Sequence, residues 1–311
     1  MPSSTANPAS RLFDEALLAL AWSLWTELGV AGVARHHGTW AVDPEALLIF
    51  TATLAERDPR LRDESLDAAL QLAPYLSMGR MKALLAMADP RTVDAFADYA
   101  ATFNAAARGE ARFPQTQAAE PLPFRRTGKS KLGTFQAPSQ VFLRLRALFG
   151  VGARADALVV ILGLPHPGWF AADLAARTGL AKRVASTVLQ DLARGGLLEV
   201  AAVGNRLRYD LLHRPETLAL TGAFPSIQPS WSPLFRFLIT LQALLQRAPS
   251  RKEVALLVDA QRALQLFQTE QTRCGLPQPR LPLNTWPEVA AWSVALAEGL
   301  ARGQWEGLGV G

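Results

Sequence analysis

Five polar residues between positions 182 and 190 have side chains that can read DNA. Lysine and arginine donate to guanine edges, glutamine pairs with adenine, and serine and threonine bind base edges or phosphates. The set comprises Lys182, Arg183, Ser186, Thr187 and Gln190. Bases meet the N-terminal part of a recognition helix, where these residues are expected. Two cations at a helix start oppose the macrodipole, so local stability does not explain Lys182 and Arg183.

The segment 170–198 predicts the two helices that must position these side chains. In the first helix Leu174 and Ala175 face the core. Gly179 follows at a turn where left-handed backbone favours glycine, and Leu180 fills the corner. The second helix ends at Gly196 and carries an apolar stripe at helical spacing: Val184, Val188, Leu189 and Leu192. The polar set then faces solvent.

Residues 198–211 predict a β-hairpin directly after these helices. Val200 and Tyr209 are typical strand residues, and Gly204-Asn205 is a two-residue turn of the kind that hairpins use. Arg206 and Arg208 are expected near the hairpin tip. Two helices, a tight turn and a basic ribbon together are more specific than any of these features alone.

This stretch, roughly residues 153–212, resembles the winged helix-turn-helix regulators of the MarR, ArsR and GntR type. The matching positions are Leu174-Ala175, Gly179-Leu180, Ala181-Lys182-Arg183, Leu189, Leu192 and Gly196-Leu197. Ala185 departs from the pattern, because these families more often have Val or Ile there; a small rotation that uses Val184 could compensate. The resemblance implies a winged-helix fold and a DNA-binding role, and it leaves the operator and effector open.

Residues 108–133 lack helical periodicity and predict a basic linker. Its last part carries Arg125, Arg126, Lys129 and Lys131 with no acidic residue. This arm is either a solvated chain or a segment that tracks the phosphate backbone beside the hairpin.

The net charge of +5 is unevenly distributed along the chain. Residues 1–122 hold ten basic and fifteen acidic residues, residues 123–215 hold fourteen and five, and residues 216–311 hold eight and seven. The balances are −5, +9 and +1. A basic excess confined to the central third favours a polyanion-binding surface.

The fold class expected is mainly α, with a central winged helix-turn-helix domain at 134–215 between helical domains at 1–107 and 216–311. Asp43-Pro44-Glu45 predicts a helix start, since Asp caps, Pro fits the first turn and Glu suits the positive helix end. Further helices are expected at 141–149, after Gly150–Gly152 from 153, and at 234–247, 252–274 and 286–302.

Composition argues against several other classes of protein. A single cysteine, Cys274, and four histidines leave few metal ligands, so no metal or cofactor is expected. No phosphate-binding glycine-rich loop or catalytic triad spacing is present, and the carboxylates of 58–67 alternate with arginines as on a solvent-exposed face. The longest apolar run, 157–165, is too short to span a membrane, and no signal peptide is evident, which indicates a cytoplasmic protein.

Two functions remain open at this stage. The first is a DNA-binding transcriptional regulator. The resemblance implies that it is a repressor and that it acts as a homodimer on a palindromic site. The second is a protein-interaction module, such as an antitoxin or scaffold, that holds a partner protein through its helical domains and regulates its own expression. An enzyme ranks below both.

Overall fold

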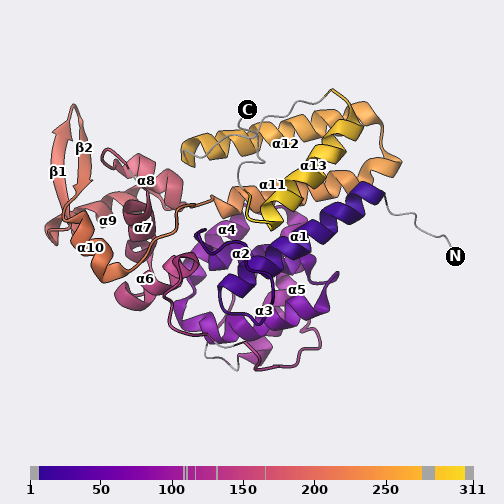
Figure 1. Ribbon diagram of the computed structural model, residues 1–311, viewed down its shortest axis with the longest axis horizontal. Coiled ribbons are helices and arrows are strands. Elements are labelled where there is room, and N and C mark those ends of the chain that lie inside the picture. The colour runs from indigo at the N-terminus through magenta and orange to yellow at the C-terminus, as the bar shows by residue number, and fades with distance from the viewer. Residues whose placement is uncertain are drawn as a thin grey trace.

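The computed structural model describes residues 7–304 except 108, 110, 116, 131, 165 and 275–283. Within these residues the chain is mainly helical, with thirteen α-helices and one two-stranded antiparallel hairpin (Figure 1). Short 3-10 helices occur at Ala73–Tyr75, Pro138–Gln140 and Ala248–Ser250. No helix in this part of the chain combines the length and apolarity needed to cross a bilayer.

The first five helices begin where the local sequence dictates. Each follows an Asn, Asp or Ser whose side chain accepts a backbone N–H of the first turn, and four have proline as their first residue. The expected start at Asp43 is confirmed, since its carboxylate accepts the N–H of Ala46 at 3.1 Å. The five are α1 (Pro8–Glu27), α2 (Pro44–Leu54), α3 (Pro59–Leu72), α4 (Met78–Ala86) and α5 (Pro90–Ala106).

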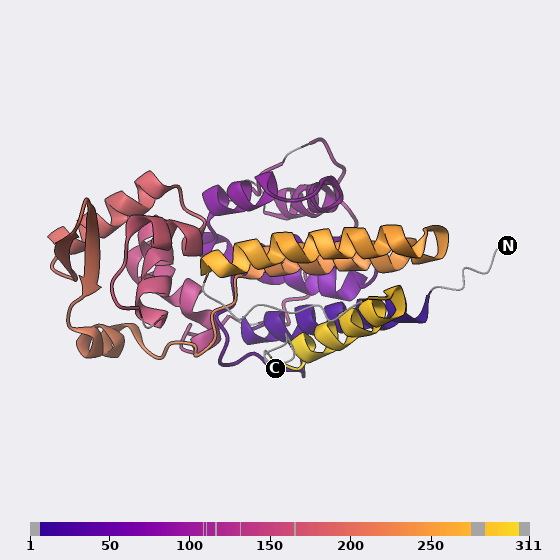
Figure 2. The same ribbon diagram turned by 90° about the horizontal axis from the view of Figure 1, so that it is seen from above.

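The last three helices pack on the first five. They are α11 (Trp231–Arg247), α12 (Glu253–Cys274) and α13 (Trp286–Ala301). Helix α13 lies along α1, and the rings of Phe50 and Phe235 stack at 4.2 Å (Figures 1 and 2). The two flanking regions therefore share one hydrophobic core instead of forming two domains. We call α1–α5 with α11–α13 the helical body.

The central elements have a second core and lie at one end of the helical body (Figures 1 and 2). The expected break at Gly150–Gly152 is confirmed: one helix of this central part ends at Phe149 and the next begins at Ala153. We call these elements the central module: α6 (Val141–Phe149), α7 (Ala153–Gly163), α8 (Ala171–Thr178), α9 (Lys182–Arg194), β1 (Leu198–Val203), β2 (Arg206–Leu211) and α10 (Arg214–Thr221).

The segment expected as a linker packs against the helical body. Phe113 is buried and stacks on Phe103 at 3.7 Å. Further along, the N–H of Gly128 donates to the Asp67 carboxylate at 2.7 Å. Glu64 and Asp67 are both buried, so the expectation that 58–67 forms a solvent-exposed face was wrong for these two residues. Buried carboxylates need hydrogen-bond donors, and this segment supplies them.

Candidate nucleic-acid interface

Helices α8 and α9 meet at a tight turn built on Gly179. Its φ is +72°, in the left-handed region, and its N–H donates to the carbonyl oxygen of Ala175 at 2.9 Å. This confirms the expected turn and its need for glycine. Residues 180 and 181 complete the connection before α9 begins at Lys182.

The buried stripe of α9 is displaced by one residue from the expected position. Ala185 is fully buried together with Val188, Leu189 and Leu192, while Val184 is 40% exposed. Positions 185, 188, 189 and 192 follow the helical spacing i, i+3, i+4 and i+7. Assigning Val184 to the core was therefore wrong, because the small Ala185 occupies that place and no compensating rotation occurs.

The five polar residues of α9 occupy its outer side. Lys182, Arg183, Thr187 and Gln190 are exposed and Ser186 is half-buried. Arg183, Thr187 and Gln190 form a row at i, i+4 and i+7. The Thr187 hydroxyl donates to the Arg183 carbonyl at 3.1 Å, and neither Lys182 nor Arg183 has an ion-pair partner among the described residues. The outer side of α9 is thus an open basic and polar surface.

The hairpin forms with the expected turn. Val203 pairs with Arg206 across Gly204-Asn205. Trp169, just before α8, joins β2 as a further bridge: its N–H donates to the Tyr209 carbonyl at 2.7 Å, and the Tyr209 N–H donates to the Trp169 carbonyl at 2.9 Å. This bridge fixes the hairpin beside the start of α8.

The two hairpin arginines have partners within the protein. The Arg206 guanidinium lies 3.9 Å from the centre of the Phe170 ring and 4.0 Å from the Asp173 carboxylate. Arg208 Nε donates to Asp210 at 2.9 Å. Both side chains remain partly exposed, but they are less free than the sequence suggests.

Arg126, in the basic part of segment 108–133, contacts the helical body and not the central module. Arg126 pairs with Asp67 of α3 at 3.2 Å, and its neighbours Arg125 and Lys129 are exposed. Lys131 lies outside the described residues. Of the two alternatives for this segment, the contact of Arg126 with α3 does not support a phosphate-tracking arm beside the hairpin.

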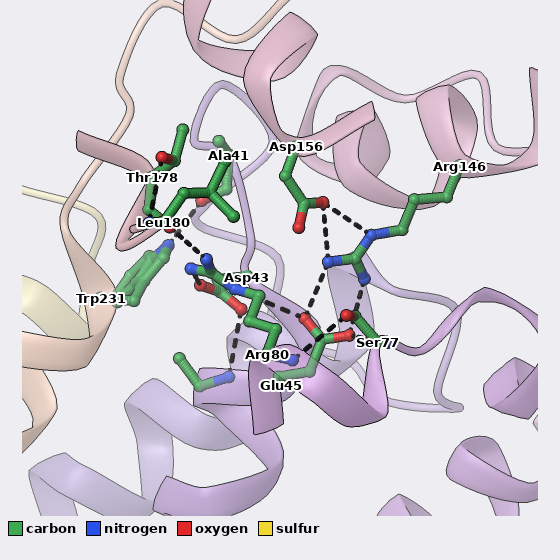
Figure 3. A network of polar contacts seen from close by, with 11 residues as sticks. Ala41, Asp43, Glu45, Ser77, Arg80, Arg146, Asp156, Thr178, Leu180 and Trp231 are labelled. Carbon is green, nitrogen blue, oxygen red and sulfur yellow. Dashed lines mark hydrogen bonds and ion pairs between the residues drawn. The ribbon is translucent and has the colours of Figure 1, made fainter. Parts of the chain in front are cut away.

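A buried ionic network joins the central module to the helical body (Figure 3). Arg146 of α6 bonds to Glu45 of α2 at 2.7 Å and to Asp156 of α7 at 2.9 Å. Arg80 of α4 binds Asp43 at 2.5 Å and donates to the Thr178 carbonyl at 2.6 Å. Arg146 therefore counts toward the basic excess of residues 123–215, but its side chain is buried and does not contribute to a basic surface.

Asp43 is ionised within this network. Burial alone would raise its pKa, but the charge and hydrogen bond of Arg80 and the N–H of Ala46 outweigh burial, so the pKa lies below its usual value. Sequence reasoning recognised Asp43 only as a helix cap. The partner Arg80 lies 37 residues further along the chain, and no local pattern connects the two residues.

Comparisons of the chain with protein-family models, curated proteins and solved structures found no significant match. Within the part of the chain that the structure describes, no group of His, Cys, Asp and Glu side chains is arranged to hold a metal ion. The candidate site is therefore defined by its own geometry: the outer side of α9, the start of α8 and the adjoining hairpin.

Proposed function

We propose that the central module is a winged helix-turn-helix and that the protein binds duplex DNA as a transcriptional regulator. The observation that carries this proposal is the open outer side of α9, with Lys182, Arg183, Thr187 and Gln190 exposed beside a hairpin. An exposed helix with base-competent side chains near its N-terminus fits the major groove. The small Ala185 and Gly179 allow α8 and α9 to pack closely.

Phosphate binding would come from the start of α9. No side chain caps this helix at Ala181, and its first turn has no acidic residue. The free backbone N–H groups and the cation of Lys182 can therefore meet a DNA phosphate. Arg206, held over Phe170, would contact the backbone at the hairpin side.

Regulation by repression is the simplest consequence of such binding. Two copies would place their recognition helices about 34 to 36 Å apart on a palindromic site and block a promoter. We propose the homodimer, the repression and a cytoplasmic location together with DNA binding.

A second candidate function is a protein-interaction module, such as an antitoxin or scaffold. The observation that favours it is apolar exposure on the hairpin: Val200, Val203 and Leu207 are each nearly half exposed. In the register of the hairpin Val200 and Leu207 lie on one face, where they offer an apolar surface that a partner protein could cover.

Binding to fluorescently labelled duplexes tests the first function against the second. Fluorescence anisotropy with the DNA upstream of the gene and with a scrambled duplex, at roughly 50 and 200 mM salt, measures affinity, specificity and salt dependence. The test variant is Lys182→Gln with Arg183→Gln. The matched control is Arg251→Gln with Lys252→Gln, an exposed basic pair directly before α12.

The proposal expects the test variant to lose at least about tenfold in affinity and the control variant to keep wild-type affinity within about twofold. Equal losses in both variants would mean that only net charge matters, and the recognition-helix assignment would be wrong. No binding by the wild-type protein to either duplex would leave the protein-interaction function as the better candidate.

A further inference from the structure

A cavity of about 800 Å³ lies between the helical body and the central module. Its walls come from α4, α7, α8, the start of α9, the segment before α11 and the first two turns of α11, and the end of α12 contributes Glu270. Figure 3 shows several of its lining residues, among them Arg80, Thr178, Leu180 and Trp231. Cavities of this size at a junction between domains are typical of small-molecule sites.

The lining is mostly apolar. Alanine, valine and leucine side chains of α4, α7 and α8 predominate, with Phe142 and Trp231 as the aromatic members. An apolar ligand body would gain burial against these walls without losing hydrogen bonds.

The charges of the lining favour a ligand with one anionic group. Each of the three lining carboxylates already has an arginine partner: Asp43 binds Arg80, Asp156 binds Arg146, which also binds Glu45, and Glu270 binds Arg236. Lys182, at the start of α9, lines the same cavity and has no ion-pair partner among the described residues. Arg80 also keeps a buried Nε that has no hydrogen-bond acceptor.

We propose that this cavity binds a small amphipathic anion: a compact apolar body, such as one or two rings, with a single carboxylate- or sulfonate-type group beside Lys182. The apolar walls would hold the body and Lys182 would hold the charge. A neutral molecule of the same shape would keep the contacts with the apolar walls and lose the attraction to Lys182.

This ligand would also compete with DNA, an extension that rests on the proposed function. Lys182 belongs both to the cavity and to the outer side of α9. An anion bound beside it neutralises a charge that DNA phosphates need. Ligand binding should therefore weaken DNA binding.

Two fluorescent probes with the same ring body test the site directly. 8-Anilinonaphthalene-1-sulfonate carries the anionic group, and N-phenyl-1-naphthylamine lacks it. Titration of the full chain in the absence of DNA measures both affinities. We expect each probe to bind at a single saturable site. Lys182→Gln should weaken the sulfonate about threefold to fivefold, as an exposed ion pair allows, and leave the neutral probe unchanged.

A cavity-filling variant controls for probe binding elsewhere on the surface. Ala83 of α4 lines the cavity and is exposed, so Ala83→Trp fills space without disturbing the core. It should weaken both probes at least about tenfold. Ala105→Trp, at an exposed alanine of α5 outside the cavity, is the matched control and should change neither. Circular dichroism checks that both variants fold.

The outcomes separate this proposal from the proposed function. Unchanged probe binding in Ala83→Trp, or equal weakening of both probes in Lys182→Gln, would overturn the ligand site whatever the DNA result. If the probes bind at this site but the protein does not bind DNA, the ligand site is supported and only the proposed competition between ligand and DNA is rejected. Where both activities occur, saturating sulfonate should lower DNA affinity in the wild type and not in Ala83→Trp.

Discussion

Arg80 Nη1 donates a 2.6 Å hydrogen bond to the carbonyl oxygen of Thr178, the last residue of α8. Its other terminal nitrogen binds Asp43, directly before α2. One side chain of the helical body therefore holds the turn that leads into α9. The position of the candidate recognition helix depends on this contact as well as on the core of the central module.

Replacing Arg80 should destabilise the protein strongly. Arg80→Met leaves the buried Asp43 carboxylate without its cation, which is expected to cost about 3 to 5 kcal/mol of unfolding free energy. Urea unfolding followed by tryptophan fluorescence measures this loss. Adding Asp43→Asn should restore part of it, because the amide can still cap Ala46 without a charge. A loss below about 0.5 kcal/mol in Arg80→Met, as at a surface position, would contradict the role assigned to this ion pair.

Arg183 and Arg206 should differ in what they contribute to DNA binding. Arg183→Ala should reduce discrimination between the preferred duplex and a random one by about 1 to 3 kcal/mol if it contacts a guanine. Arg206→Ala should weaken both duplexes alike and flatten the salt dependence of binding. Selection of the preferred duplex from a random library, then anisotropy at several salt concentrations, measures both effects. If Arg206→Ala reduced discrimination and Arg183→Ala weakened both duplexes alike, the base contact would instead lie at the hairpin.

The rotation of α9 about its axis can be checked with two neighbouring residues. Val184→Ala, at an exposed position, should change the unfolding free energy by less than about 0.5 kcal/mol. Ala185→Val places two extra methyl groups in a filled core and should cost about 1 to 3 kcal/mol. Urea unfolding of both variants measures the difference. Equal effects, or a larger loss from Val184→Ala, would show that Val184 faces the core.

His37 should make the stability of the helical body depend on pH. The side chain is buried, and its Nε2 donates to the Leu300 carbonyl at 2.8 Å, so Nδ1 accepts from the Ser23 hydroxyl at 2.8 Å. Burial lowers the pKa of His37 to about 4, against a weaker opposing effect of the Leu300 carbonyl. Because this folded pKa lies below the unfolded one, the unfolded chain is protonated first as the pH falls.

The contribution of His37 is therefore complete above about pH 7 and declines as the pH falls towards 4. Between about pH 7 and pH 5 the unfolding free energy should drop by about 2 kcal/mol on account of this residue. Urea unfolding at both pH values measures the change. His37→Gln cannot titrate and should lose most of this slope; an unchanged slope would assign the pH dependence to other groups.

Local features of the sequence predicted much of the secondary structure. The helix start at Asp43-Pro44, the turn at Gly179 and the hairpin turn at Gly204-Asn205 each depend on a few adjacent residues. Their conformations follow from backbone sterics and nearby hydrogen bonds, which a short stretch of sequence contains. The rotation of α9 was ambiguous by one residue, because Val184 and Ala185 can both face a core.

The sequence by itself determined the helices, the hairpin and the set of polar residues on α9. Only the tertiary structure decided which charges reach the surface. Arg146 lies in the interior, Arg126 binds α3, and Arg206 is held by Phe170 and Asp173, although all three belong to the same basic third of the sequence. The cavity beside Lys182 likewise exists only in the folded chain. Ion pairs and cavities depend on distances between residues far apart in sequence, and those distances are set when the two cores pack together.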